Sequence, residues 1–131
     1  MFKLNVRYIV KLLGMTHLLE SFFMLAATGV AFGYGGCDFY PLLISTGIMS
    51  GTGLLLYLIG RKGNDYRSGR REGMLSVSFM WTMFSFLGML PYLISGYIDN
   101  VTDAFFETMS GFTTTGATIL TDIEALPKGL L

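Results

Sequence analysis

The stretch FYPLLISTGIMSGTGLLLYLIG, residues Phe39–Gly60, contains no charged side chain. A helix needs about 20 apolar residues to cross the hydrocarbon layer of a bilayer. Because lipid offers no hydrogen-bond partner to a bare backbone, a segment that lies in this layer must be helical. The sequence therefore predicts a membrane-spanning helix over 39–60.

Two other segments, 8–32 and 73–98, are also apolar enough and long enough to cross the membrane. The second has no charged residue, whereas the first contains Lys11, His17 and Glu20. We interpret 8–32 as a spanning helix whose polar stripe faces other helices. The alternative is a secretory signal peptide, but the apolar part contains a carboxylate and is longer than the roughly 7–15 residues of a signal.

Within this first span, His17 and Glu20 lie three residues apart and share one face of the helix. An ionisable pair inside a span is a candidate functional site by default. We favour the alternatives, which are an interhelical hydrogen bond or a position near the inner leaflet.

Glycine and proline positions predict how the spans pack and bend. Two G-x-x-x-G spacings, Gly29 with Gly33 and Gly47 with Gly51, favour close helix packing within the chain. The alternative is a chance spacing, because the chain has 17 glycines. Pro91 is expected to kink the third span, because proline removes a helix hydrogen bond.

The composition agrees with a membrane protein. Of 131 residues, 52% are hydrophobic and 14% are charged, and the mean hydropathy is +0.56, whereas globular domains carry about 25% charged residues. A net charge of zero gives nucleic-acid binding no electrostatic support. One cysteine excludes an internal disulfide, and one histidine makes a Ser-His-Asp triad a poor candidate. We expect neither an enzyme nor a bound cofactor.

The basic residues indicate the orientation of the spans. Lys3, Arg7 and Lys11 lie near the N-terminus, and the loop 61–72 carries five basic and two acidic residues. Because an excess of Lys and Arg marks the cytoplasmic side, both regions are predicted to be cytoplasmic and the connection 33–38 to be external. We favour a purely topological role for the basic residues of this loop. The alternative is that the loop contacts a cytoplasmic partner or anionic lipid headgroups.

Three crossings leave the chain on the outer side, and the next segment, 100–112, is too short to cross again. Its apolar residues follow helical spacing. Asn100 or Thr102 can cap its start, and Asp103 and Glu107 favour its N-terminal half. We predict a half-length helix that enters from outside and ends in the middle of the membrane.

The loop after this helix is the candidate site. It consists of Thr113, Thr114, Thr115, Gly116, Ala117 and Thr118. Cation filters are built from backbone carbonyls that replace the ion's hydration shell, and Gly116 permits the backbone angles that aim successive carbonyls one way. The loop has no ionised side chain, which suits a weakly held monovalent cation. The alternative is a Thr/Gly-rich external loop after a surface helix, and the topology favours the filter.

The motif FETMSGFTTTGAT, Phe106–Thr118, resembles the first pore loop of the Trk/Ktr potassium transporter superfamily, TrkH type. The resemblance implies an all-α membrane protein with two leading transmembrane helices. An outer helix, a re-entrant pore helix and a filter loop of a potassium-channel-like repeat then follow. It implies that 1–72 form the leading pair with a cytoplasmic basic loop, and that 73–131 form the first of four pore repeats.

The resemblance also implies a function, which is potassium uptake across the bacterial plasma (inner) membrane through a channel-like pore. The implied ligands of the ion are the carbonyls of Thr114, Thr115, Gly116 and Ala117, flanked by Thr113 and Thr118. Potassium is then the transported substrate rather than a cofactor. For the full-length protein, the implied partners are the lipid bilayer, a cytoplasmic nucleotide-binding regulatory subunit and a second copy in a homodimer.

The chain ends at Leu131, where the resemblance places the start of the first inner helix. We therefore expect a fragment that supplies one of four filter loops. Two other classes of function stay open. A secondary transporter, with the half-helix at its substrate site, predicts an inverted repeat. A non-conducting membrane scaffold predicts that substitution of Gly116 leaves cation uptake unchanged.

Overall fold

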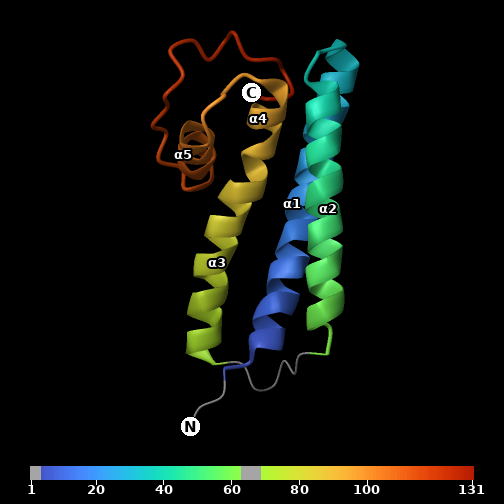
Figure 1. Ribbon diagram of the computed structural model, residues 1–131, viewed down its shortest axis with the longest axis vertical. Coiled ribbons are helices and arrows are strands. Elements are labelled where there is room, and N and C mark those ends of the chain that lie inside the picture. The colour runs from blue at the N-terminus through green and yellow to red at the C-terminus, as the bar shows by residue number, and fades with distance from the viewer. Residues whose placement is uncertain (1–3, 63–68) are drawn as a thin grey trace.

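The computed structural model describes residues 4–62 and 69–131, and in these ranges it is helical without any strand (Figure 1). The helices described are α1 Val6–Tyr34, α2 Phe39–Gly60, α3 Arg70–Gly88, α4 Leu90–Ser95 and α5 Val101–Phe112. The predicted all-α class is confirmed. The middle of the predicted basic loop 61–72 lies outside the described residues.

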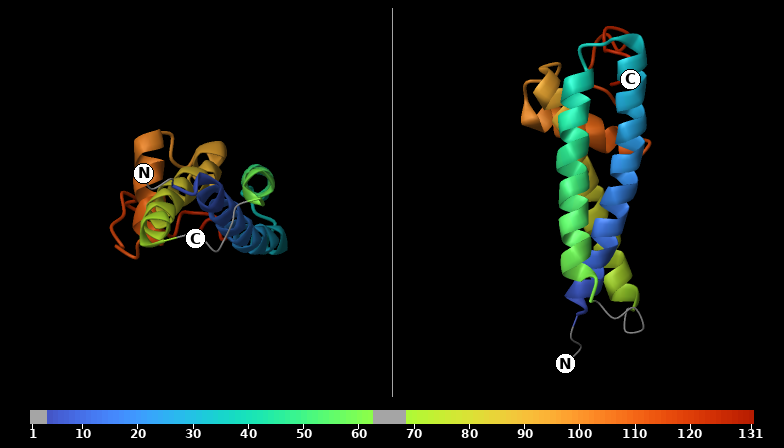
Figure 2. Two further views of the ribbon diagram at one scale, coloured as in Figure 1. Left: turned by 90° about the horizontal axis from the view of Figure 1, so that it is seen from below. Right: turned by 90° about the vertical axis from the view of Figure 1, so that its right-hand side faces the viewer.

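Three long segments stand side by side, namely α1, α2 and the α3–α4 pair (Figures 1 and 2). By length and composition, 6–34, 39–60 and 70–95 can each cross a membrane. All three predicted spans are therefore confirmed as helices. The bounds of 39–60 agree with the prediction, whereas the first helix extends slightly beyond the predicted 8–32 at both ends.

Glycines set the distance between the antiparallel helices α1 and α2. A Cβ atom on Gly14 would meet the backbone of Tyr57 and lie 2.8 Å from the carbonyl oxygen of Gly53. A Cβ atom on Gly60 would lie 2.5 Å from the Cα atom of Lys11. Small residues let helix backbones approach closely, and here one backbone lies directly against the other. We call this contact the α1–α2 seam.

The two predicted G-x-x-x-G packing faces do not pack within the described chain. Gly29, Gly33, Gly47 and Gly51 are exposed, and a Cβ atom on any of them would meet no atom within 4 Å. The prediction of close packing at these positions is wrong, because they lie on faces of α1 and α2 that point away from the seam.

The third span is interrupted at Met89, between α3 and α4. Pro91 has no N–H to donate to the carbonyl of Leu87, so the regular helix hydrogen bond at this turn is missing. The N–H groups of Tyr92 and Leu93 both donate to the Met89 carbonyl, at 3.1 and 3.2 Å. The kink predicted from Pro91 is confirmed.

The short helix α5 lies across α3 rather than alongside it (Figures 1 and 2). Near its start, Ala104 is buried in one cluster with Met89 and Ile98. At its end, the ring of Phe112 packs on Phe84, with centroids 5.7 Å apart. Because Phe84 precedes Met89 on the span, the end of α5 lies farther from the α4 end of the bundle than its start does.

Different segments of the chain lie at the two ends of the helix bundle. The start of α1, the end of α2 and the start of α3 lie together, whereas α5, the C-terminus and the connection 35–38 lie at the other end (Figure 1). At the first end, a Glu72 carboxylate accepts hydrogen bonds from the backbone N–H groups of Gly69 and Asn5, at 3.0 and 3.4 Å. The described parts of the two basic segments therefore lie at the bundle end opposite α5, and the cytoplasmic position of this end stays a prediction.

Candidate functional site

The helix α5 begins and ends at defined hydrogen bonds. The Asn100 side chain accepts a hydrogen bond from the N–H of Thr102 at 3.0 Å, which caps the first turn as predicted. At the other end, the N–H of Thr113 donates to the Met109 carbonyl at 2.9 Å. The chain then leaves the helix and reverses direction.

The reversal uses two left-handed backbone positions. Thr114 has a φ of 56° and Gly116 a φ of 72°, and Thr114 is the one non-glycine residue with positive φ among those described. Such a conformation is uncommon and costly for a residue with a Cβ atom. A Cβ atom on Gly116 would meet nothing within 4 Å of this chain. The backbone angle, rather than a lack of space within this chain, therefore selects glycine at position 116.

The incoming limb of the loop is bonded to the end of α5. The N–H of Thr115 donates to the Ser110 carbonyl at 3.0 Å. The Thr113 hydroxyl donates to the Met109 carbonyl at 2.8 Å and lies 2.8 Å from the hydroxyl oxygen of Thr115. These local bonds fix the incoming limb through its own helix.

The outgoing limb is held by side chains of α5. The Ser110 hydroxyl donates to the carbonyl of Ala117 at 2.6 Å. The Glu107 carboxylate accepts from the Thr118 hydroxyl at 2.8 Å and from the N–H of Ile119 at 3.0 Å. From the sequence, Glu107 is assigned only a favourable charge in the helix. The signal that could have identified it is its spacing of three residues from Ser110, which places both on one face of α5.

The predicted site residues 113–118 lie together in this loop, and all are exposed. Among the described residues, no group donates a hydrogen bond to the carbonyls of Thr114, Thr115 or Gly116. The Ala117 carbonyl accepts the Ser110 hydroxyl, and a carbonyl oxygen has a second lone pair. The loop therefore presents a run of carbonyl oxygens that have acceptor capacity left.

After the loop, the chain returns to the tip of the α1–α2 pair. The N–H of Gly129 donates to Oδ2 of Asp38 at 2.8 Å, and the Tyr92 hydroxyl donates to the Leu130 carbonyl at 3.3 Å. Leu130 is buried in a cluster with Ala31. These contacts attach the segment that follows the candidate site to the leading helices, a connection that the sequence does not predict.

Asp38 is central to this attachment, because it is fully buried and bonds the tail through one oxygen. The substitution Asp38→Ala in the full-length protein leaves the N–H of Gly129 without its acceptor, and a buried unpaired group costs about 1–3 kcal/mol. We expect amide hydrogen exchange in 126–130 to rise by roughly tenfold or more, while exchange in α2 stays slow. Hydrogen-exchange mass spectrometry measures both segments in one experiment.

The control for this prediction is Asp122→Ala, which removes an exposed carboxylate from the same C-terminal segment. The Asp122 side chain accepts a hydrogen bond from the N–H of Glu124, two residues away, and so acts locally. Its loss should leave exchange in 126–130 unchanged. Equal exchange in Asp38→Ala and the wild type would show that Asp38 does not hold the tail.

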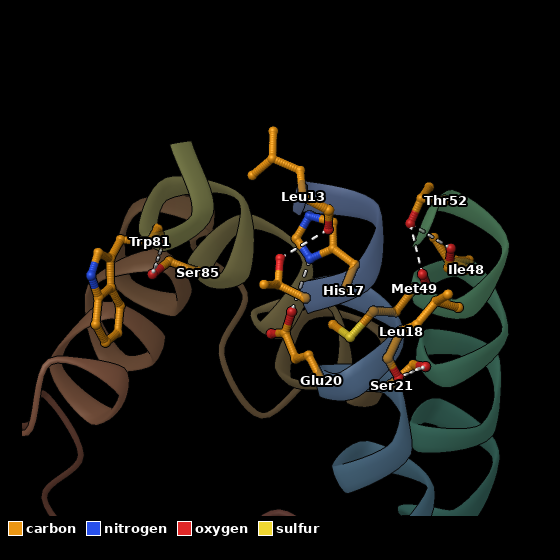
Figure 3. A network of polar contacts seen from close by, with 11 residues as sticks. Leu13, His17, Leu18, Glu20, Ser21, Ile48, Met49, Thr52, Trp81 and Ser85 are labelled. Atoms are coloured by element: carbon orange, nitrogen blue, oxygen red, sulfur yellow. Dashed lines mark hydrogen bonds and ion pairs between the residues drawn. The ribbon is translucent and has the colours of Figure 1, made fainter. Parts of the chain in front are cut away.

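A second polar group lies inside α1. Nδ1 of His17 is 3.2 Å from Oε2 of Glu20, and the two residues are 0% and 7% exposed. Both side chains point from α1 toward α3 (Figure 3), where the His17 ring packs on Phe84 with centroids 5.3 Å apart. This hydrogen bond lies within α1, which corrects the interhelical hydrogen bond, one of the two alternatives favoured for the pair, while a position near the inner leaflet stays a prediction. Nε2 of His17 and Oε1 of Glu20 have no hydrogen-bond partner among the described residues.

Known proteins share both the sequence and the fold of this chain. No protein-family model matches it. It is 32% identical to the Trk system potassium uptake protein TrkH of Halomonas elongata, over 98% of the chain and 27% of that protein. The crystal structure of the potassium transporter TrkH from Vibrio parahaemolyticus matches with a TM-score of 0.86 at 32% identity, over 97% of the chain and 27% of that structure. These matches in sequence and fold support the identification of the chain as TrkH-type. The resemblance seen in the motif 106–118 is thereby confirmed.

Other TrkH relatives are similar over shorter stretches. The TrkH protein of Escherichia coli is 47% identical over 62 residues, which are 47% of the chain and 13% of that protein. The chain spans about a quarter of the length of the TrkH proteins that it matches over nearly all of its own length. The names of these relatives state potassium uptake for the whole proteins.

Proposed function

We propose that this chain supplies one filter loop of a potassium uptake channel in the bacterial plasma membrane, and that 113–118 contact the ion. The observation that carries the proposal is the left-handed turn at Thr114 and Gly116, held on both limbs by α5. It occurs in a chain whose named relatives take up potassium. Four such loops, one from each repeat of the full-length protein, would surround the ion.

The depth of α5 along the third span supports a re-entrant helix. Its last residue, Phe112, packs on Phe84, while the third span ends at Ser95. At about 1.5 Å per residue, Phe84 lies about 16 Å from that end, which is roughly half of the ~30 Å hydrocarbon layer. Irregular backbone at such a depth is tolerated only beside protein or water, and this supports a pore-lining loop.

The chemistry of the loop supports a monovalent cation as its ligand. Thr114, Thr115 and Gly116 offer carbonyls without a donor, and Ala117 offers its second lone pair. Neutral carbonyl dipoles can replace a hydration shell and still let the ion leave. The C-terminal end of α5 carries a partial negative charge and precedes the loop directly.

We further propose that 1–72 form two leading helices with a cytoplasmic basic loop and that 73–131 belong to the first pore repeat. Charge supports the N-terminus as cytoplasmic. The described basic residues at the bundle end opposite α5 are Arg7, Lys11, Arg61, Lys62, Arg70 and Arg71. An excess of basic residues marks the cytoplasmic side, so α5 and the loop start from the external side.

The proposed partners belong to the full-length protein in its membrane. They are the transported potassium ion, the lipid bilayer, a second copy in a homodimer and a cytoplasmic nucleotide-binding regulatory subunit. The last two follow from the resemblance to the Trk/Ktr superfamily alone. The proposed role is transport, without a catalytic residue or a resident cofactor.

Growth of a bacterium deficient in potassium uptake tests the proposed function. We expect the full-length gene product to restore growth at low external potassium and to take up rubidium as a potassium tracer. We also expect its reading frame to encode three further loops with glycine at the position of Gly116. A full-length protein that reaches the membrane without restoring growth contradicts the proposal, and an inverted repeat would favour a secondary transporter instead.

A further inference from the structure

We propose that Glu107 is a positioning residue for ion selectivity: its carboxylate fixes the outgoing limb of the loop and thereby the directions of the carbonyls at 114–117. The inference rests on the proposed function of this loop and deepens it. Glu107 does not reach the ion in this proposal. It acts on the ion through the backbone that it holds.

Both carboxylate oxygens of Glu107 are used, each by a different donor of the outgoing limb. Oε1 accepts the Thr118 hydroxyl and Oε2 accepts the N–H of Ile119. Hydrogen bonds to an ionised group are roughly twice as strong as neutral ones. The hydroxyl oxygen of Thr118 also accepts the N–H of Leu120 at 3.0 Å. The carboxylate therefore organises three consecutive residues after the proposed filter.

The outgoing limb has little else to hold it. The incoming limb continues from α5 and shares backbone hydrogen bonds with the last turn of that helix. Among the described residues, the outgoing limb is hydrogen-bonded to α5 through Glu107 and through the Ser110 hydroxyl on Ala117. Without Glu107, one neutral hydrogen bond would have to keep this limb in place.

A loosened limb has a specific consequence for an ion filter. Discrimination between cations depends on the size of the carbonyl cage or on the number and strength of its dipoles. Both quantities require that the carbonyls keep their directions. We therefore expect loss of Glu107 to lower the preference for potassium over sodium, and not only the amount of uptake.

A double-mutant cycle in the full-length protein tests this role. Glu107→Ala is expected to lower the potassium-over-sodium preference by about tenfold, as the loss of charge-assisted hydrogen bonds predicts. Thr118→Val should lower it by less, because the bond to Ile119 remains. The double variant should equal Glu107→Ala, since the shared hydrogen bond can be lost only once. The preference is measured as rubidium uptake into reconstituted liposomes with and without excess external sodium.

Two further variants separate positioning from charge and from folding. Asp103→Asn removes a carboxylate from the same helix, and Asp103 makes no hydrogen bond to the loop in the described structure. This variant should lower the rate of rubidium uptake at low salt, because a carboxylate that attracts cations is lost. It should leave the preference for potassium over sodium unchanged. Glu107→Gln keeps one oxygen acceptor and should give a preference between those of the wild type and Glu107→Ala.

The outcomes distinguish this inference from the proposed function. An equal loss of preference in Asp103→Asn, or additive effects in the double variant, would overturn the positioning role. A preference that stays at the wild-type value in Glu107→Ala, while Gly116→Ser lowers it, would also overturn it and leave the proposed function intact. Absence of potassium uptake by the wild-type protein in liposomes would refute the proposed function itself. A partly unfolded sample would lower rubidium uptake by the same factor with and without sodium, so a change in the measured preference cannot come from unfolding.

Discussion

Replacing Gly116 with aspartate in the full-length protein (Gly116→Asp) is expected to abolish potassium uptake, and Gly116→Ser to lower the preference for potassium over sodium by about tenfold. The backbone at Gly116 has a φ of 72°. A side chain in this left-handed region costs about 1–2 kcal/mol, which favours a change of backbone angle and so of the carbonyl directions. Aspartate adds a fixed negative charge to a loop that is otherwise neutral, and a cation would then bind too tightly to leave.

The matched control is Gly111→Ala, five residues earlier in the same motif. Gly111 lies in the last turn of α5, is exposed and does not have a positive φ. A Cβ atom there meets nothing within 4 Å of this chain, and alanine favours a helix over glycine by about 1 kcal/mol. Uptake should therefore stay at the wild-type level.

Rubidium uptake by reconstituted liposomes, with and without excess sodium, measures the effect of all three glycine variants. The amount of folded protein is checked by size-exclusion chromatography before reconstitution. Unchanged uptake in Gly116→Asp would contradict the filter and is the result expected of a non-conducting scaffold. Equal losses in Gly116→Asp and Gly111→Ala would show that the motif tolerates no added atom, whatever the backbone angle.

The helices of this chain could be predicted from the sequence because their signals are local. An uncharged run such as 39–60 has to be helical in lipid wherever its neighbours lie. The kink near Pro91 and the Asn100 cap could also be predicted, because each depends on residues within one helical turn. The helix α5 could be predicted from the helical spacing of its apolar residues, whereas its depth in a membrane stays a prediction.

The long-range contacts of the site could not be predicted in this way. The bonds from Glu107 to Thr118 and Ile119, and from Asp38 to Gly129, join residues whose distance is set by the path of the loop and the tail. Nothing in the local pattern gives that path. The candidate loop was identified by its motif, but the side chains that shape it emerged only from the fold.

The prediction for the packing glycines failed for a related reason. A G-x-x-x-G spacing shows that two glycines share a helix face, but not that another helix covers this face. In the described chain, the covered face of α2 carries Gly53 and Gly60, whereas Gly47 and Gly51 are exposed. Helical spacing shows which residues share one face of a helix. Which face is covered depends on the position of the partner helix.

The α1–α2 seam gives the second large prediction, which is a loss of stability in Gly14→Ala. The added Cβ atom would lie 2.7 Å from the Cα atom of Tyr57 and 2.8 Å from the carbonyl oxygen of Gly53. The three nearest atoms all belong to the backbone, so no rotamer change can relieve the overlap and the two helices must move apart. Overpacking of this kind costs about 1–3 kcal/mol, and we expect a lower apparent melting temperature of the full-length protein in detergent.

Gly47→Ala is the matched control, because it makes the same chemical change in the middle of α2. No atom of this chain lies within 4 Å of the added Cβ atom, and alanine stabilises a helix relative to glycine by roughly 0.5–1 kcal/mol. The two variants should therefore shift the melting temperature in opposite directions. A rise in both would mean that α1 and α2 do not approach at Gly14.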